Sequence, residues 1–115
     1  MGGMPDARDP HSLLPLTPAL FHVLVALADG ETHGYAIMKE VEHLTDGAVR
    51  LSTGTLYGII KRLLAEGLIK EKRTVGDARR RRYELTPFGS DVARAEARRL
   101  EQALRLARRK ALFRT

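Results

Sequence analysis

The chain has 115 residues and no cysteine, so it has room for one domain with a modest core and cannot contain disulfides or thiolate metal sites. Only 5% of its residues are aromatic and none is tryptophan, which favours packed helices over a β-sandwich and leaves a second copy as a source of further buried area. Its formal net charge of +6 is unevenly distributed, because residues 1–48 carry two basic and seven acidic side chains whereas residues 49–115 carry eighteen basic and seven acidic ones.

Residues 1–12 are rich in Gly, Pro and Asp and are predicted to form a flexible N-terminal arm. The longest apolar stretch, residues 13–28, is interrupted by Pro15, Pro18 and His22, and the residues before it are acidic rather than basic. We therefore expect neither a signal peptide nor a membrane span, and we expect a cytoplasmic protein.

Residues 13–86 are predicted to form one domain that starts with three helices. The first begins at Thr17-Pro18, a capping hydroxyl followed by proline, and ends at Asp29-Gly30. The second runs from about Thr32–Gly34 to Asp46-Gly47, and the third begins after Ser52 and ends at Gly67. Their buried faces are predicted from apolar residues at helical spacing: Leu16, Leu20, Val23, Leu24 and Leu27; Ile37, Val41 and Leu44; Leu56, Ile59, Ile60, Leu63 and Leu64.

Two short runs on either side of a Gly-Asp turn, Ile69–Arg73 and Arg81–Leu85, predict a β-hairpin. Thr86-Pro87 then repeats the cap-plus-proline signal and opens a last helix, predicted over Pro87 to Leu112. The predicted fold is mainly α with a small two-stranded β-hairpin, a winged helix-turn-helix followed by a long C-terminal helix. Residues 87–115 form the predicted dimerisation segment.

The last helix carries a stripe of small and medium apolar residues on an otherwise charged surface. Its members follow alternating steps of four and three: Ala93, Ala97, Leu100, Leu104, Ala107 and Ala111. A helix of about 25 residues spans roughly 37 Å, which is longer than such a domain needs to cover. We expect this stripe to form a homodimer rather than to pack on its own domain.

The concentration of basic residues in the second part of the chain favours a polyanionic partner, with nucleic acid first and an anionic membrane surface second. In a winged helix-turn-helix the start of the third helix enters the major groove. Candidate DNA-contacting residues on this helix are Ser52, Thr53, Thr55, Tyr57 and Lys61. The alternative is that Ser52 only caps the helix and that Lys61 belongs to a solvated face.

The hairpin has the strongest charge signal in the chain. Lys70, Lys72 and Arg73 precede the turn and Arg79, Arg80, Arg81 and Arg82 follow it, with only Glu71 and Asp77 between them. Four adjacent arginines repel one another unless an anion screens them, so we expect Arg79, Arg80 and Arg81 to contact DNA phosphates and to supply affinity more than base specificity.

Enzymatic and metal-binding motifs are not found. The four histidines lie ten or eleven residues apart, none of them forms a helical pair, and no phosphate loop, nucleophile elbow or paired-carboxylate spacing occurs. We expect no enzyme activity, no cofactor and no metal, and we interpret His33 as a structural hydrogen-bonding residue at the start of the second helix.

Several motifs resemble the PadR family of bacterial transcriptional regulators. They are His33-Gly34-Tyr35, Ser52-x-Gly54-Thr55-Leu56-Tyr57, Leu63-x-x-x-Gly67-Leu68-Ile69 and Tyr83-x-Leu85-Thr86-Pro87-x-Gly89. The resemblance covers residues 16–89 and implies a winged-helix repressor that dimerises through its C-terminal helix, binds a palindromic operator and in many members is released by a small-molecule effector. It also implies that Tyr57 and the basic wing face DNA, while Tyr35 and Tyr83 support the packing between helix and wing.

This chain departs from the family pattern in two ways. Arg82 stands where the family commonly has an aromatic residue, and the chain lacks the tryptophan against which short members bind planar ligands. Two further functions stay open from the sequence: a non-specific or architectural nucleic-acid binder, and a protein-interaction or membrane-surface module that uses the same fold as a scaffold.

Overall fold

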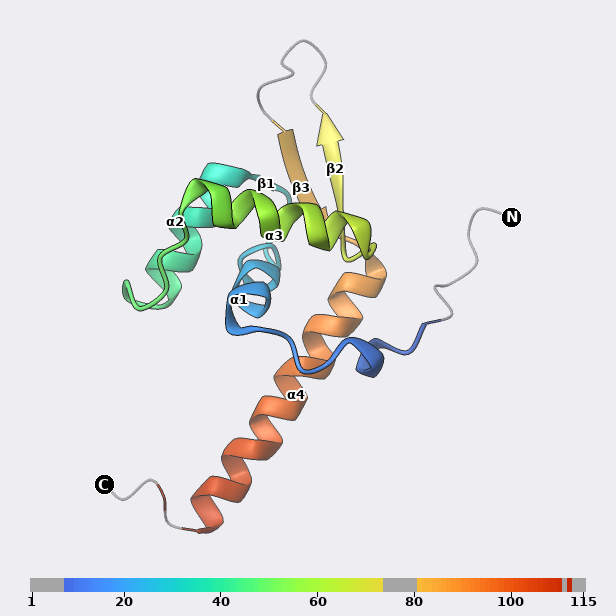
Figure 1. Cartoon of the computed structure of the whole chain (residues 1–115). Helices are drawn as coiled ribbons and strands as arrows, with labels where there is room; N and C mark the ends of the chain where they lie inside the picture. The colour runs from blue at the N-terminus through green and yellow to red at the C-terminus, as the bar shows by residue number, and fades with distance from the viewer. Residues whose placement is uncertain (1–7, 74–80, 111, 113–115) are drawn as a thin grey trace.

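The computed structural model describes residues 8–73, 81–110 and 112. The elements in chain order are η1 (Pro10–Leu13), α1 (Pro18–Ala26), β1 (Thr32–His33), α2 (Gly34–Leu44), α3 (Thr53–Ala65), β2 (Ile69–Arg73), β3 (Arg81–Leu85) and α4 (Pro87–Arg109). Figure 1 shows α1, α2 and α3 gathered beside the small sheet, with α4 leading away from them. The predicted mainly helical fold with a wing and a long last helix is confirmed.

Three predicted helix starts depend on the same local hydrogen bond. The hydroxyl oxygens of Thr17, Ser52 and Thr86 each accept a hydrogen bond from the backbone N–H of the residue three positions later in the chain. The N···O distances are 3.2, 3.1 and 3.0 Å. Each bond satisfies a donor that the first turn of a helix leaves without an intrahelical partner. The last helix ends at Arg109 rather than at Leu112, because Lys110 closes it as the C-cap.

The sheet has a third strand that the sequence did not predict. The predicted hairpin of β2 and β3 is present, and β1 adds to the other side of β3 so that the order is β1-β3-β2, all antiparallel. The two residues of β1 pair as Thr32 with Tyr83 and His33 with Arg82. This pairing anchors the start of α2 to the wing.

The core lies where α1, α2, α3, β3 and α4 meet. Apolar side chains from these elements are buried together, among them Leu24, Ile37, Leu56, Tyr83 and Val92. Most of the predicted apolar stripes of the three helices belong to this core, but Leu44, at the end of α2, is exposed. Burial of one large aliphatic side chain contributes roughly 1.5–3 kcal/mol, so the core stabilises the three-helix arrangement that presents α3.

Packed structure begins earlier in the chain than the sequence predicted. Residues 8–12, assigned above to a flexible arm, include most of η1, which lies against α4. Asp9 caps η1 by accepting the N–H of His11 at 2.9 Å. The packed part of the chain therefore extends beyond the predicted boundary at residue 13.

The end of α3 and the start of α4 are in direct contact. The Thr86 hydroxyl donates to the Gly67 carbonyl oxygen at 2.6 Å, and a Cβ on Gly89 would lie 1.8 Å from the carbonyl oxygen of Leu68. No side chain fits at that distance, so glycine is needed at position 89. This junction sets the end of α3 close to the first turn of α4.

Beyond its first half, α4 leaves the domain. Phe88, Val92, Ala95 and Glu96 are buried, whereas every described residue from Ala97 onward is exposed except Ala107. Figure 1 shows this half of the helix projecting away from the other elements. Among the described residues, no helix is long and apolar enough to span a membrane.

Candidate nucleic-acid interface

The first turn of α3 is exposed and bears three small hydroxylated residues. Ser52 accepts the N–H of Thr55 and also donates its own hydroxyl to the Thr55 hydroxyl at 2.9 Å. Thr53 is exposed, and nothing lies within 4 Å of a Cβ placed on Gly54. The predicted capping role of Ser52 is confirmed, and the surface beside it is exposed.

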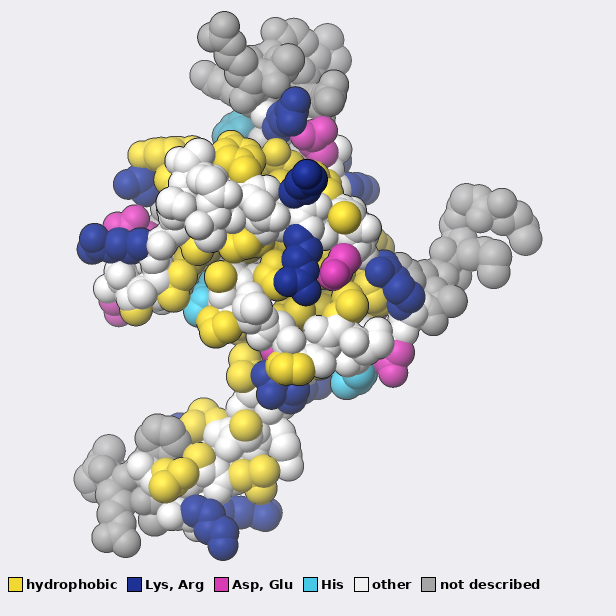
Figure 2. All heavy atoms as spheres, viewed as in Figure 1, with side chains coloured by type: hydrophobic (Ala, Val, Ile, Leu, Met, Phe, Trp, Pro, Cys, Tyr) yellow, Lys and Arg dark blue, Asp and Glu magenta, His cyan; other side chains and the backbone are white. Residues whose placement is uncertain are grey.

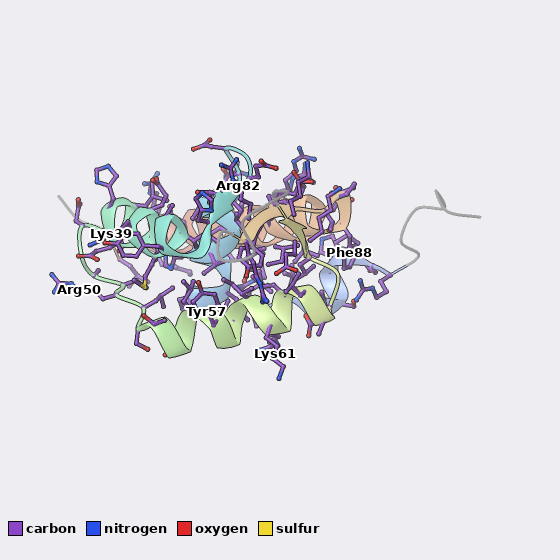
Figure 3. The ribbon with its side chains drawn as sticks, turned by 90° about the horizontal axis from the view of Figure 1, so that it is seen from above. Lys39, Arg50, Tyr57, Lys61, Arg82 and Phe88 are labelled. Carbon is purple, nitrogen blue, oxygen red and sulfur yellow. The ribbon has the colours of Figure 1, made fainter. Side chains whose placement is uncertain are left out.

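Tyr57 and Lys61 lie one turn apart on the exposed side of α3. Tyr57 is 49% exposed, and its ring lies over Gly34, where an added Cβ would be 2.8 Å from the phenol oxygen. Figure 3 shows the Lys61 side chain pointing away from the rest of the molecule. Lys61 has no acidic partner in the described ranges. Its charge is therefore available to an external anion.

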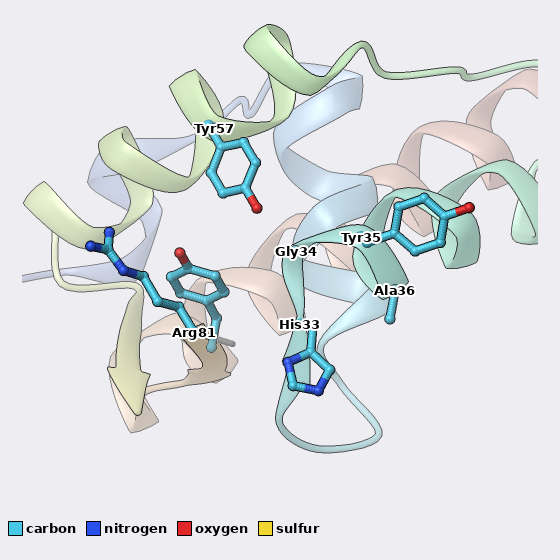
Figure 4. A pocket seen from close by; sticks show the side chains of 7 residues that line it. His33, Gly34, Tyr35, Ala36, Tyr57 and Arg81 are labelled. Carbon is cyan, nitrogen blue, oxygen red and sulfur yellow. The ribbon is translucent and has the colours of Figure 1, made fainter. Parts of the chain in front are cut away.

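A pocket of about 360 Å³ lies between the start of α2, the middle of α3 and strand β3. Its lining residues are His33, Gly34, Tyr35, Ala36, Tyr57, Arg81 and Tyr83 (Figure 4). Figure 4 shows the Tyr57 ring reaching over the pocket from α3, whereas the Tyr35 ring points away from it. The pocket thus lies between α3 and the wing on one face of the molecule.

The groups around this pocket are hydrogen-bond donors. His33 stands at the N-cap of α2 but makes no side-chain cap bond, so the first N–H groups of α2 lack the partner that the other long helices have. Burial raises the pKa of the Tyr83 hydroxyl, and the nearby Glu71 carboxylate raises it further. Tyr83 therefore stays protonated and can donate a hydrogen bond, and the Arg81 guanidinium, which lies beside the Glu71 carboxylate, adds a positive charge to the lining of the pocket.

Two expectations about residues near this pocket are wrong. His33 does not act as a structural hydrogen-bonding residue through its Nδ1, because that buried atom has no partner among the described residues. Tyr35 is 65% exposed and does not support the packing of helix on wing. Tyr83 does support it, being 3% exposed. The difference is one of position, since Tyr35 follows Gly34 in the first turn of α2 and faces away from the core, whereas Tyr83 lies on the central strand.

One face of the wing carries paired charges rather than available ones. Lys70 and Lys72 on β2 approach the Glu84 carboxylate on β3 at 3.1 and 3.4 Å. The Glu31 carboxylate oxygens lie 3.4 Å from Lys72 Nζ and 3.2 Å from Arg82 Nη1. Because Lys72 and Arg82 are paired across β2 and β3, Glu31 lies beside two neighbouring basic residues. The Glu84 charge raises the pKa of Lys72, and the hydrogen bond from Lys70 lowers the pKa of Glu84.

Lys70, Lys72 and Arg82 therefore have counter-ions within the protein. Carboxylates of the chain itself screen them. Figure 3 places Arg82 on the side of the molecule opposite Lys61, away from the exposed face of α3. The pairing of Glu84 with the lysines of β2 could have been predicted, because Glu84 alternates with the buried Tyr83 in the strand. The role of Glu31 depends on its contact with Arg82, which is 51 residues away in the sequence.

The other face of the wing turns toward the pocket. Arg81 lines the pocket and lies 3.5 Å from a Glu71 carboxylate oxygen, with its side chain 55% exposed. Arg79 and Arg80 lie outside the described residues. Arg81 is therefore the one wing arginine of the predicted DNA contacts that lies in the described part of the chain, and it lines the same pocket as Tyr57. Tyr57 in turn lies one helical turn from Lys61 on α3.

The predicted dimerisation stripe is on the surface. Leu100 and Leu104 are 42% and 39% exposed, Ala97 is exposed, and Ala93 and Ala107 are half-buried. Ala111 lies outside the described residues. Leu106 and Leu112, which are not on the stripe, are also exposed, at 50% and 73%. Figure 2 shows apolar side chains gathered on the projecting half of α4 with basic side chains at its edge.

The described residues include no cluster of three or more His, Asp or Glu side chains that could hold a metal ion. The pocket beside Tyr57 has no carboxylate among its lining residues and no thiol. Its chemistry suits hydrogen bonding to an oxyanion rather than metal coordination.

The sequence matches known proteins over most of its length. The family model described as "Transcriptional regulator PadR-like family" matches residues 23–95. Transcriptional regulator Rv3488 of Mycobacterium tuberculosis is 39% identical over 85 residues, which are 73% of this chain and 77% of that protein. An uncharacterized 37.1 kDa protein in transposon Tn4556 of Streptomyces fradiae is 43% identical over 75 residues, 65% of this chain, and the match spans only 21% of that protein.

Solved structures share the fold. A transcriptional regulator from Clostridium thermocellum superimposes with a TM-score of 0.69 at 26% identity, over 80% of this chain and 91% of that one. Bacillus subtilis PadR, solved in complex with operator DNA, superimposes with a TM-score of 0.62 at 23% identity, over 70% of this chain and 47% of that one. The matching family and the relatives from Mycobacterium tuberculosis and Clostridium thermocellum are described as transcriptional regulators.

Proposed function

The chain belongs to the PadR-like family of transcriptional regulators, and from this premise we propose that it binds a palindromic operator as a homodimer and acts as a sequence-specific repressor. Such a regulator works on chromosomal DNA, so the cytoplasm is its expected compartment. The resemblance also favours a small-molecule effector that releases the DNA. The Bacillus subtilis structure with operator DNA supports the choice of partner.

The observation that carries this proposal is the continuous face made by the start of α3 and the pocket beside it. Thr53, Thr55 and Lys61 are exposed on α3, while Tyr57 and Arg81 line the adjoining pocket. A helix N-terminus and an arginine suit a phosphate oxygen. The exposed hydroxyl groups on the first turn are of the kind that reach base edges in the major groove.

Two roles follow from this arrangement. We propose that Arg81, with Arg79 and Arg80 of the same run, contacts the phosphate backbone and supplies affinity for every sequence. Thr55 and its neighbours on α3 discriminate between bases. Replacing Arg80 and Arg81 with Ala should weaken binding to all DNA and flatten its salt dependence, whereas replacing Thr55 should change the preferred base. If both changes acted alike on every operator, this division of roles would be incorrect.

The homodimer is supported by the apolar surface of α4. Leu100 and Leu104 project from a part of the helix that leaves the domain, and a stripe of this kind on a charged helix needs a partner. Two copies related by a two-fold axis would present two recognition helices to successive turns of a palindrome.

Selection of bound sequences from a random DNA pool tests the function directly. We expect a palindromic consensus, and competition at moderate salt should favour it over random DNA by at least about a thousandfold. With roughly eight phosphate contacts per dimer, the log–log slope of affinity against salt should be about −7. Equal affinity for consensus and random DNA would instead identify an architectural binder. Tighter binding to anionic vesicles than to DNA at the same ionic strength would point to a membrane-surface module.

A further inference from the structure

The segment before α1 is attached at both ends to the helices that carry the proposed function. At one end, the Arg8 guanidinium donates to the carbonyl oxygen of Glu66 at 2.6 Å and lies 4.3 Å from the centre of the Phe88 ring. Glu66 is the C-cap of α3, and Phe88 lies in the first turn of α4. One side chain thus contacts the end of the recognition helix and the beginning of the α4 helix.

The Arg8 contact fits the physical chemistry of a helix end. The last carbonyl groups of a helix lack intrahelical donors and carry partial negative charge, so a guanidinium there is favourable. The face of an aromatic ring attracts the same cation. A Cβ on Gly67 would lie 3.2 Å from Arg8 Nη2, so the glycine that ends α3 also makes room for the arginine.

At the other end of the segment, the backbone N–H of Leu16 donates to Glu96 Oε2 at 2.7 Å. Glu96 is 1% exposed, and its other carboxylate oxygen accepts a hydrogen bond from Arg99 Nε. The bond from Arg99 lowers the pKa of Glu96 and outweighs the effect of burial. Glu96 is therefore an ionised, fully partnered attachment point for the segment.

The two attachments are separated along α4. The first lies at the start of α4, where Thr86 donates to the carbonyl oxygen of Gly67 and Gly89 meets that of Leu68. Glu96 lies seven residues further on, roughly 10 Å along the helix axis. A second attachment at that distance resists tilting, as a brace does. Figure 1 shows the segment crossing α4 between η1 and α1.

We propose that residues 8–16 form a brace that fixes the angle between α3 and α4, and that Arg8 is a positioning residue for DNA recognition. This inference depends on the proposed function, because the angle matters when two recognition helices are joined through paired α4 helices. Arg8 touches no base in this scheme. It sets the spacing at which a dimer reads its two half-sites.

Half-site spacing provides a test that a merely structural role would not affect. Each added base pair moves one half-site by about 3.4 Å and turns it by about 34°. With the full-length chain and the selected palindrome, affinity is measured at the natural spacing and with one base pair added or removed. We expect the wild-type protein to lose affinity by at least about tenfold at the altered spacings, and R8A to lose no more than about threefold.

Two further variants make the outcome decisive. R105A removes one positive charge from an exposed position of α4 and should keep the wild-type spacing profile. R8K keeps the charge but loses the planar stacking group, so its profile should lie between those of the wild type and R8A. All variants should remain dimers by sedimentation. A wild-type profile for R8A would overturn the brace, whereas failure of the wild-type protein to select any palindrome would overturn the proposed function instead.

Discussion

The phenol ring of Tyr57 lies across Gly34, so that a Cβ at position 34 would be 2.8 Å from the Tyr57 hydroxyl oxygen. This contact joins the exposed side of α3 to the first turn of α2 and holds Tyr57 over the pocket that Arg81 also lines. Glycine at position 34 therefore matters for where Tyr57 points, and not for the backbone conformation.

Replacing Gly34 with Ala should move the Tyr57 ring without unfolding the protein. The clash involves the far end of a side chain that is 49% exposed, so the free energy of unfolding should change by less than about 1 kcal/mol. DNA affinity should fall by roughly tenfold, and by a similar factor when Tyr57 itself is changed to Ala. A double-mutant cycle checks the mechanism, because fully additive losses in G34A/Y57A would mean that the two residues act separately.

Replacing Glu31 with Gln should increase DNA affinity. The change would remove one negative charge beside Lys72 and Arg82, although Glu84 would still pair with Lys72. Each additional phosphate that either cation then binds should make the salt slope steeper by about 0.9. Titration of random DNA at several salt concentrations measures both effects. E101Q removes an equal charge from α4, where Glu101 pairs with Arg105, and serves as the control. Equal increases in affinity for both variants would show that only net charge matters.

Replacing Leu100 and Leu104 with Glu should produce monomers. Both side chains lie on the predicted stripe, and two buried carboxylates facing their symmetry mates would oppose association. Sedimentation at micromolar concentration gives the oligomeric state. L106E places one glutamate on an exposed apolar residue off the stripe and should remain dimeric. A monomeric L106E would show that the interface covers more of the helix.

Replacing Gly89 with Ala should destabilise the fold strongly. The added methyl would lie 1.8 Å from the Leu68 carbonyl oxygen, and backbone must shift to admit it, at a cost of about 3 kcal/mol or more. Urea denaturation measures this change. G58A is the matched control, since nothing lies within 4 Å of that site. It should stabilise α3 by about 0.5–1 kcal/mol, and similar stabilities for both variants would contradict the close contact.

Glu96 should contribute to stability at neutral pH and lose that contribution in acid. Its hydrogen bond from Arg99 holds its folded-state pKa below the ordinary value of 4.5. The unfolded chain then binds the proton first as pH falls, so the stabilisation is full well above pH 4.5 and disappears below it. The stability difference between wild type and E96Q should therefore shrink as pH is lowered from 7 to 3. A constant difference would mean that the charge has no role.

The helix boundaries and the order of elements could be predicted because their causes are local. Thr17, Ser52 and Thr86 each bind an N–H three residues away, a distance within which sequence and structure are tightly linked. The exposed face of α3 with Thr55, Tyr57 and Lys61, and the surface position of Leu100 and Leu104, followed from helical periodicity.

Amino-acid order alone thus determined which residues form helices and which helix faces are apolar, since both depend on neighbours within one or two turns. Only the tertiary structure decided the charge partners and long-range attachments. Glu31 and Arg82 are 51 residues apart, Leu16 and Glu96 are 80 apart, and Arg8 and Glu66 are 58 apart. Such pairs arise where packing brings distant segments together, and local sequence patterns do not encode these contacts. For that reason the sequence did not indicate the carboxylate partners of the wing, and it placed residues 8–12 in a flexible arm.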